Sequence, residues 1–188
     1  MFPLGNVLAP AGVLPLHVFE PRYQALMADC LDRDGRFGVV LIERGSEVGG
    51  GDHRAAVGTM ASIEQYERFD DGRFALIAVG RDRFRVEAWL DDDPYPRAVV
   101  DDWPDRPLDP ADQNLLIEAE QAMERFRPVD DPLPERSSDP SLASHQLTAL
   151  APLGPYDRYR LLCQPGPADR LRELTLLLDD LPDVDPLA

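Results

Sequence analysis

The hydrophobic positions along the chain follow two different periods, one in each half. In the first half, short segments rich in β-branched residues alternate between apolar and polar positions, as half-buried strands do. In the second half, apolar residues recur at intervals of three and four, the spacing of one helix face. The pattern therefore predicts a β-rich half followed by a helical half, which is an α+β protein.

Strands are predicted in the first half at residues 37–42, 58–69, 73–79, 83–90 and 97–100. The sequence Asp70-Asp71-Gly72 separates the second strand from the third, and Asp-Gly supplies the positive φ angles of a tight hairpin turn. We therefore expect these two strands to be antiparallel neighbours. One helix is expected within this half, because Pro21 suits a first helical turn and apolar residues recur at helical spacing up to Leu31.

Four helices are predicted in the second half. The first follows an apolar stripe from Leu115 to Phe126 and ends before Pro128, which cannot continue a helix. The other three begin at Pro140, Pro155 and Pro167, each at a plausible first helical position. Residues 128–140 are rich in Pro, Asp and Ser and are expected to form an exposed connection. We place the boundary between a β-rich part, 1–107, and a helical part, 108–188.

The charge of the chain limits its partners. With 35 acidic and 19 basic residues, its formal net charge is -16, so nucleic acid and anionic membranes are poor partners. All the basic residues are arginine, and the absence of lysine excludes a P-loop, a Schiff-base enzyme and a Ser-Lys protease within this chain. We assign no catalytic residue and do not expect an enzyme.

Cysteine and histidine residues give no sign of a metal or cofactor. Cys30 and Cys163 have no CxxC partner, so we expect two buried thiols in a reducing compartment. The three histidines lack ligand spacing, so neither a metal site nor another cofactor is expected. The chain has no signal-like segment or membrane-length apolar run, which favours the cytoplasm. It reaches an apolar segment already at Phe2, so we expect the start to be slightly truncated.

The most specific motif lies at residues 2–31, which read FPLGNVLAPAGVLPLHVFEPRYQALMADCL. This string resembles the opening of Lon protease N-terminal substrate-binding domains, in which an FPL segment, an LPLxxFEPRY segment and a following helix recur. The similarity continues through EVGGGDHRAAVGTMASI, ALIAVGRDRFRVEAW, DDPYPRAVV and SLASHQLTALAPLGPYDRYRLLCQPGPADRLREL. It covers nearly the whole chain. The resemblance implies a PUA-like β pseudobarrel with one inserted helix, followed by a C-terminal α-helical bundle.

The resemblance also implies a function. It suggests a non-catalytic module that binds polypeptide segments or a client protein, either recognising unfolded segments or acting as an adaptor to a separate protease. Because the chain carries neither the ATPase nor the protease module, we expect another protein to supply unfolding and cleavage. The alternative is a small-molecule-sensing domain with a ligand cleft between the two halves. RNA binding rests on the PUA-like analogy alone and is disfavoured by the charge.

The candidate peptide-binding residues are aromatic, apolar or charged side chains within the family-like motifs: Phe2, Leu4, Phe19, Glu20, Arg22, Tyr23, Trp89 and Tyr95. Each has a structural alternative. Phe2 and Leu4 suit the core, Phe19 and Tyr23 suit a contact between helix and sheet, and Glu20 suits an ion pair. The aromatic residues Trp89, Tyr95 and Trp103 suit the seam between the halves. Arg81, Arg83 and Arg85 are expected on one solvated strand face.

Overall fold

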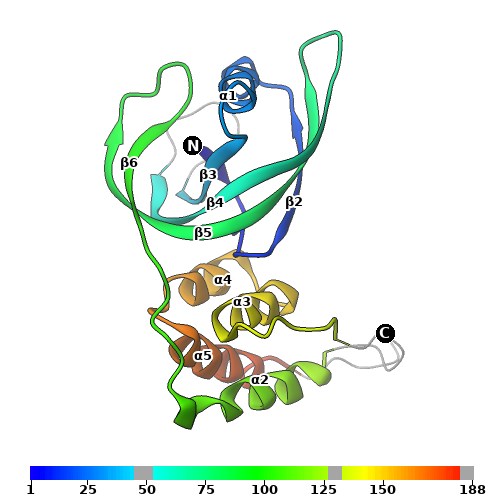
Figure 1. Ribbon diagram of the computed structural model, residues 1–188, viewed down its shortest axis with the longest axis vertical. Helices are drawn as coiled ribbons and strands as arrows, with labels where there is room; N and C mark the ends of the chain where they lie inside the picture. The colour runs from blue at the N-terminus through cyan, green and yellow to red at the C-terminus, as the bar shows by residue number, and fades with distance from the viewer. Residues whose placement is uncertain (45–52, 127–132, 183–188) are drawn as a thin grey trace. The chain divides into compact units, whose positions relative to one another are not determined.

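The computed structural model describes residues 1–44, 53–126 and 133–182. The chain divides into two compact units, Met1–Pro104 and Asp105–Ala188. The first unit contains β1 (Phe2–Leu4), β2 (Val13–Val18), α1 (Pro21–Leu31), β3 (Arg36–Arg44), β4 (His53–Arg68), β5 (Phe74–Leu90) and β6 (Arg97–Asp102). The second contains a short 3₁₀ turn (Pro110–Asp112), then α2 (Asn114–Glu124), α3 (Pro140–Leu150), α4 (Pro155–Leu162) and α5 (Pro167–Asp179). The predicted α+β class is confirmed (Figure 1).

The strands of the first unit form one mixed sheet in the order β1-β3-β4-β5-β2, with β6 also paired to β5. Only β1 and β3 are parallel among the described pairs. The predicted antiparallel hairpin is confirmed, with Gly72 at a φ of 85° in its turn. The segments 73–79 and 83–90, predicted as separate strands, form the single strand β5. Its first part pairs with β2 and its second part with β6, so β5 curves through the whole unit (Figure 1).

Gly80 fixes the position of β2 against β5. A Cβ atom at residue 80 would lie 2.2 Å from the Ala9 carbonyl oxygen, so a larger residue would force the two segments apart. The Gly80 N–H donates to the Gly12 carbonyl at 2.9 Å, and the Gly80 carbonyl accepts from the Ala11 N–H at 2.9 Å. Residue 80 therefore sets where the antiparallel register of β2 begins.

The core of the first unit lies between the sheet and α1. The buried face of α1 presents Tyr23, Leu26, Met27 and Cys30. This face packs with alternate residues of the strands, namely Leu16, Val18, Phe37, Val39, Ala61, Phe74, Leu76 and Ala78. Burial of these side chains stabilises the unit by about 1.5–3 kcal/mol for each large apolar group.

The second unit is a bundle of four helices around leucine-rich positions. The predicted helix starts at Pro140, Pro155 and Pro167 are confirmed. At the start of α3, the Asp139 side chain accepts from the Ser141 N–H at 2.9 Å and so caps the helix. The core comprises Leu116, Ala119, Met123, Ala143, Leu147, Ala151, Leu153, Leu161, Leu171, Leu174 and Leu178. Of the predicted 128–140 connection, residues 133–139 form no helix or strand, and residues 128–132 lie outside the described residues.

A buried polar group, which we call the Asp105 cluster, joins distant parts of the second unit. It comprises Asp105, Ser141, Ser144, His145 and Arg170. Both guanidinium Nη atoms of Arg170 donate to the Asp105 carboxylate at 2.8 Å, and Nη1 also donates to the Ser144 hydroxyl at 2.7 Å. The Arg170 side chain is fully buried. The division between units falls after Pro104, whereas the sequence placed it after residue 107. Asp105 thus belongs to the second unit, where its partner Arg170 lies.

The environment of Asp105 keeps its carboxyl group ionised. Burial alone would raise the pKa of this group. Hydrogen bonds from His145, Arg170 and Ser141, together with the Arg170 charge, outweigh that effect and hold the pKa well below its usual range. The cluster is therefore a charge pair with its hydrogen bonds largely satisfied.

No helix in the described part of the chain is both long enough and apolar enough to cross a membrane.

Candidate functional site

Three of the predicted binding residues belong to the core of the first unit. Phe2, Leu4 and Tyr23 are buried, and the rings of Phe2 and Tyr23 stack with their centroids 4.3 Å apart. Residues buried in this way hold α1 and β1 in place and cannot meet a polypeptide without unfolding of the core. For these three residues the structure supports the structural alternative.

The charged residues of the FEPRY motif lie at the start of α1. The Arg22 Nε atom donates to the Glu20 carboxylate at 3.1 Å, and the Arg22 guanidinium lies 4.5 Å from the centroid of the Tyr23 ring. The structure thus brings Glu20, Arg22, Tyr23 and Phe2 together around one helix terminus. Phe19, the first residue of the motif, is 57% exposed and is not part of this group.

Trp89 and Tyr95 are both held by neighbouring side chains. The Arg54 guanidinium lies 5.1 Å from the Trp89 ring centroid and binds the Asp92 carboxylate at 2.6 and 2.9 Å. This hydrogen bonding lowers the pKa of Asp92 despite its partial burial. The Tyr95 hydroxyl donates to the Asp29 carboxylate, and this bond, with burial, raises the pKa of Tyr95 to about 12. Both aromatic residues are half-buried, which favours a structural role.

The predicted basic row on β5 is interrupted. A register shift between Thr59 and Ala61 of β4 lies opposite residues 80–83 of β5, so strict alternation fails there. Arg83 is buried, contrary to the solvated face that the sequence predicted. The guanidinium groups of Arg83 and Arg85 lie 4.3 and 3.6 Å from the Trp103 ring centroid, as in cation–π contacts. Arg81 binds Glu64 at 2.5 Å.

The cysteines are both free, as expected, but only Cys30 is buried. Burial raises the pKa of the Cys30 thiol to about 11, which makes it unreactive. Cys163 is partly exposed, because it caps the end of α4 rather than lying on an inward helix face. Among the residues that the structure describes, no three His, Cys, Asp or Glu side chains are grouped to hold a metal ion.

A different surface of the first unit spans three adjacent strands and carries exposed apolar side chains on two of them, β2 and β5. We call it the β2–β5–β4 face and define it by Val13, Pro15 and His17 of β2, Ala75, Ile77 and Val79 of β5, and Gln65 and Glu67 of β4. These residues alternate with Leu16, Val18, Leu76 and Ala78, which face the core. Val13 is 66% exposed and Ile77 is 40% exposed. Strands β2 and β5 therefore carry apolar side chains on both of their sides in this region.

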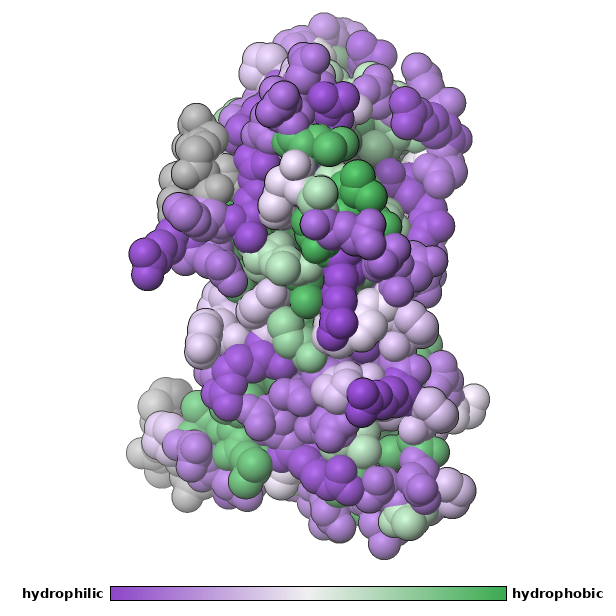
Figure 2. All heavy atoms as spheres, turned by 90° about the vertical axis from the view of Figure 1, so that its left-hand side faces the viewer, coloured by the Kyte–Doolittle hydropathy of each residue, from purple (hydrophilic) through white to green (hydrophobic). Residues whose placement is uncertain are grey.

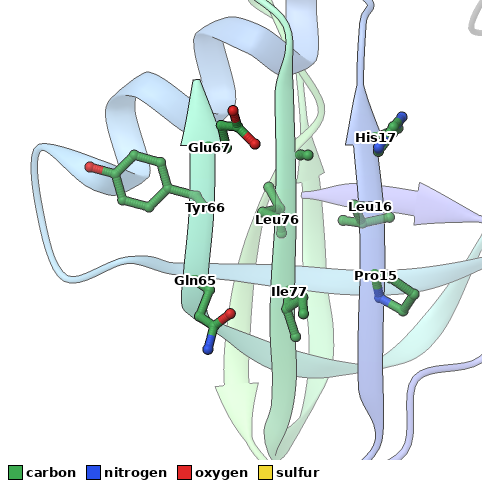
Figure 3. Close-up of a pocket in the computed structure, with 9 residues that line it drawn as sticks. Pro15, Leu16, His17, Gln65, Tyr66, Glu67, Leu76 and Ile77 are labelled. Carbon is green, nitrogen blue, oxygen red and sulfur yellow. The ribbon is translucent and has the colours of Figure 1, made fainter. Parts of the chain in front are cut away.

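The register explains why this face is hollow. Ala75 lies opposite His17 on one side and Glu67 on the other, while Ile77 lies opposite Pro15 and Gln65. A small side chain between two larger ones leaves space above the middle strand. The result is a shallow hollow of about 610 Å³ bounded by the three strands, and Figure 3 shows their side chains around it. The Tyr66 ring points away from β5 in this view.

A second, smaller hollow continues the surface at the end of β2. It has a volume of about 190 Å³ and is lined by His17, Val18, Phe19, Phe69, Arg73 and Phe74. Phe19, the one exposed aromatic residue of the FEPRY motif, therefore lies beside the β2–β5–β4 face. The candidate residues drawn from the sequence included Phe19 but not Val13 or Ile77. For Ile77 the signal in the sequence was a strand with apolar residues at both odd and even positions.

Exposed apolar residues also occur elsewhere in the first unit, at the opposite end of β5. Leu90 is 46% exposed and Val99 of β6 is 45% exposed. On the side of the chain shown in Figure 2, hydrophilic residues cover most of the surface and the hydrophobic residues form small separate patches. Single exposed apolar residues of this kind are ordinary, whereas a group of them on two paired strands beside a hollow is typical of a binding surface.

The chain thus combines an α+β fold with exposed apolar side chains on one face of its sheet. A model of the family described as the "ATP-dependent protease La (LON) substrate-binding domain" matches residues 1–180. The chain belongs to this family. The resemblance predicted from the FPL and FEPRY motifs is thereby confirmed.

Solved structures agree with this assignment. The chain is similar to a Lon N-terminal domain protein from Xanthomonas campestris, with 30% identity, a TM-score of 0.67 and 96% of each chain covered. It also has the fold of the N-terminal domain of a Lon protease from the Mycobacterium avium complex. In that comparison the TM-score is 0.66 at 18% identity, and 95% of this chain and 97% of that chain are covered.

Curated relatives are longer proteins. "Lon protease 2" of Myxococcus xanthus is 33% identical over 63% of this chain, and the match spans 14% of that protein. A "LON peptidase N-terminal domain and RING finger protein" of Schizosaccharomyces pombe is 26% identical over 88% of this chain and is matched over 42% of its own length. The family thus occurs joined to different additional parts.

Proposed function

We propose that this chain is a non-catalytic module that binds exposed segments of unfolded polypeptides, and that the β2–β5–β4 face with Phe19 is its binding surface. The observation that carries the proposal is the group of exposed apolar side chains on the neighbouring strands β2 and β5, Val13 and Ile77 above all, beside a hollow. Membership of a substrate-binding-domain family supports the same function.

Physical chemistry favours an unfolded partner for this surface. Covering the exposed apolar groups gains about 25 cal/mol for each Å² removed from water. A native protein keeps most of its own apolar side chains buried, whereas an unfolded chain presents them along its whole length. The hollow above Ala75 has room for an inserted side chain. In this proposal the surface distinguishes unfolded from native proteins by the accessibility of their apolar side chains and does not require one particular sequence.

The role in proteolysis follows as part of the proposal. A module that holds unfolded segments without cleaving them serves as an adaptor when a separate protease accepts the held chain. The occurrence of the domain in proteins named Lon protease and in a protein named for a RING finger is consistent with such a role. In this proposal the partners are client polypeptides and a protease encoded elsewhere.

Reduced, carboxamidomethylated lysozyme is a suitable probe, because it is permanently unfolded and has native lysozyme as a control of similar composition. We expect the wild-type chain to bind the unfolded form, measured by fluorescence anisotropy of the labelled probe, and not to bind native lysozyme. Equal affinity for both forms, or for neither, would contradict the proposal.

A matched pair of variants locates the surface. The double variant Val13→Thr/Ile77→Thr keeps β-branched side chains on the β2–β5–β4 face but makes them polar. It should bind unfolded lysozyme at least about tenfold more weakly, with an unchanged unfolding midpoint. The control Leu90→Thr/Val99→Thr alters residues of similar exposure at the other end of β5 and should bind normally. Equal weakening in both variants would place the binding surface elsewhere.

A further inference from the structure

The outer edge of β2 carries the next inference. β2 is the last strand of the sheet, and no strand among the described residues pairs with its other side. An edge strand of this kind presents main-chain N–H and C=O groups that can pair with another chain. Which groups point outward follows from the hydrogen bonding to β5.

Two observations fix the direction of the main-chain groups. The Gly80 N–H donates to the Gly12 carbonyl, and the next residues, Val13 and Val79, begin the regular β2–β5 register. The Gly80 carbonyl accepts from Ala11 instead of Gly12, so Ala11 and Gly12 together take the hydrogen-bonded position opposite Gly80. In an antiparallel ladder such pairs alternate with non-bonded ones. Leu14, Leu16 and Val18 therefore bond to β5, while the main-chain groups of Val13, Pro15 and His17 point to the open edge.

Pro15 independently supports this assignment. Proline has no N–H to donate, so within a sheet it is confined to positions where the missing donor would have faced away from the partner strand. Pro15 lies opposite Ile77 and leaves the pairing with β5 intact. The open edge consequently offers N–H donors at Val13 and His17 and carbonyl acceptors at Val13, Pro15 and His17.

We propose that the client segment binds in extended conformation as an additional strand along the open edge of β2, hydrogen-bonded to the main chain of Val13, Pro15 and His17. This inference rests on the proposed function and specifies how the β2–β5–β4 face takes its partner. Alternate side chains of an added strand would extend that face beside Val13 and Pro15, while Phe19 and the smaller hollow lie at one end of the edge. Main-chain bonds of this kind are independent of sequence and suit a module with many clients.

Charge defines the class of segment. The chain carries a formal net charge of -16, so its field attracts cationic segments and repels anionic ones. None of the nine described residues that line the larger hollow is arginine, and the rim includes the exposed carboxylate of Glu67. The preferred occupant is therefore an extended segment in which apolar residues alternate with basic ones.

The test uses a short fluorescent peptide in which valine alternates with arginine, long enough to pair with all six residues of β2. Two N-methylated versions share its side chains. In one, every second backbone amide is methylated, beginning at the first residue, and in the other beginning at the second. Because only one set of amides can face β2, one version should lose at least about tenfold in affinity and the other should bind nearly as the parent does. Equal effects of the two methylation patterns would overturn the inference.

Two variants at one position separate main chain from side chain on the protein. His17→Pro removes the N–H donor that faces the open edge, whereas His17→Ala keeps that donor and removes the imidazole. His17→Pro should weaken binding of the parent peptide at least about tenfold and His17→Ala by less than about threefold, with circular dichroism verifying the fold of both. Equal weakening by both variants would show that the side chain, not the main chain, makes the contact.

Hydrogen exchange gives a readout that needs no variant. The amides of Val13 and His17 should exchange at least about tenfold more slowly when the parent peptide is bound, while those of Leu14 and Leu16 should change little because β5 already protects them. Protection spread evenly over β2 would contradict the strand addition. A peptide with glutamate in place of arginine should bind more weakly, and this difference should shrink as salt is added.

The outcomes also separate this inference from the proposed function. If Val13→Thr/Ile77→Thr abolishes binding of unfolded lysozyme while the methylation patterns act equally, the face binds clients without strand addition. If neither unfolded lysozyme nor the peptides bind, both proposals fall. A wild-type dimer that His17→Pro dissociates and that the peptide cannot displace would assign the edge to a second copy of this chain.

Discussion

The β2–β5–β4 face and the Asp105 cluster differ in which groups they expose to water and which they bury. The cluster buries charged groups and hydrogen-bonds them, as the double contact of Arg170 with Asp105 shows. The face leaves apolar side chains such as Val13 and Ile77 in water, and the outer edge of β2 has no strand partner among the residues that the structure describes. The cluster has the character of a structural element, because its groups are already matched, whereas the face has unmet capacity for contact. We therefore expect stability and binding to depend on different residues of the chain.

The largest expected effect tests the structural side of this comparison. Arg170→Leu should destabilise the chain by about 3–5 kcal/mol, because it leaves the Asp105 carboxylate buried without its partner. The control is Arg172→Leu, because Arg172 lies on the same helix as Arg170 but forms an exposed ion pair, with Asp112. Its loss should cost less than about 1 kcal/mol. Urea unfolding followed by circular dichroism measures both. Similar losses in the two variants would remove the special role of the cluster.

Neighbouring residues of β5 sharpen the comparison within a single strand. Leu76→Ala removes a side chain from the core and should cost about 2–5 kcal/mol in free energy of unfolding. Ile77→Ala removes one from the exposed face and should cost less than about 1 kcal/mol while weakening binding of unfolded lysozyme. If Ile77→Ala proved as destabilising as Leu76→Ala, the face would have to be regarded as part of the core.

Lowering the pH should reduce the contribution of the Asp105 cluster to the free energy of unfolding. The pKa of Asp105 is lowered in the folded chain, so its ionised form contributes stability above the unfolded-state value of about 3.9. That contribution is lost as the pH falls from there through the folded-state value. The free energy of unfolding should thus be higher for the wild type than for the Asp105→Asn variant at neutral pH. This difference in free energy should become smaller below about pH 4. A difference that is constant with pH would mean that Asp105 is not ionised when folded.

Much of the architecture follows from local sequence, and the limits of that prediction are physical. Pro140, Pro155 and Pro167 fix φ at a first helical turn, so three helix starts were visible without any tertiary contact. Arg83 is buried beside the Trp103 ring, where alternation predicted exposure. Sequence periodicity has no access to such a tertiary contact.

The candidate site was harder to predict than the fold, because it is made by pairing between distant segments. The hollow exists because the small Ala75 side chain lies between His17 and Glu67. These three residues come from three different strands. Phe19 could be identified as a candidate from its motif, but nothing in the motif distinguished it from Tyr23, which α1 carries into the core. Likewise the contact between Asp105 and Arg170 joins residues 65 positions apart.

The smallest expected effect concerns two aromatic residues that the sequence treated alike. Tyr95→Phe removes the hydroxyl that donates to Asp29 and should cost about 0.5–1.5 kcal/mol in free energy of unfolding while leaving binding unchanged. Phe19→Ala should cost less than about 1 kcal/mol yet weaken binding of unfolded lysozyme, because the ring lies exposed beside the β2–β5–β4 face. Unfolding curves and anisotropy titrations on the same two preparations measure both quantities. A Tyr95→Phe variant that binds poorly with normal stability would return Tyr95 to the binding surface and show that contact capacity extends beyond the face. If stability and binding depend on different residues, Tyr95→Phe should lower stability and leave binding unchanged, whereas Phe19→Ala should weaken binding with little loss of stability.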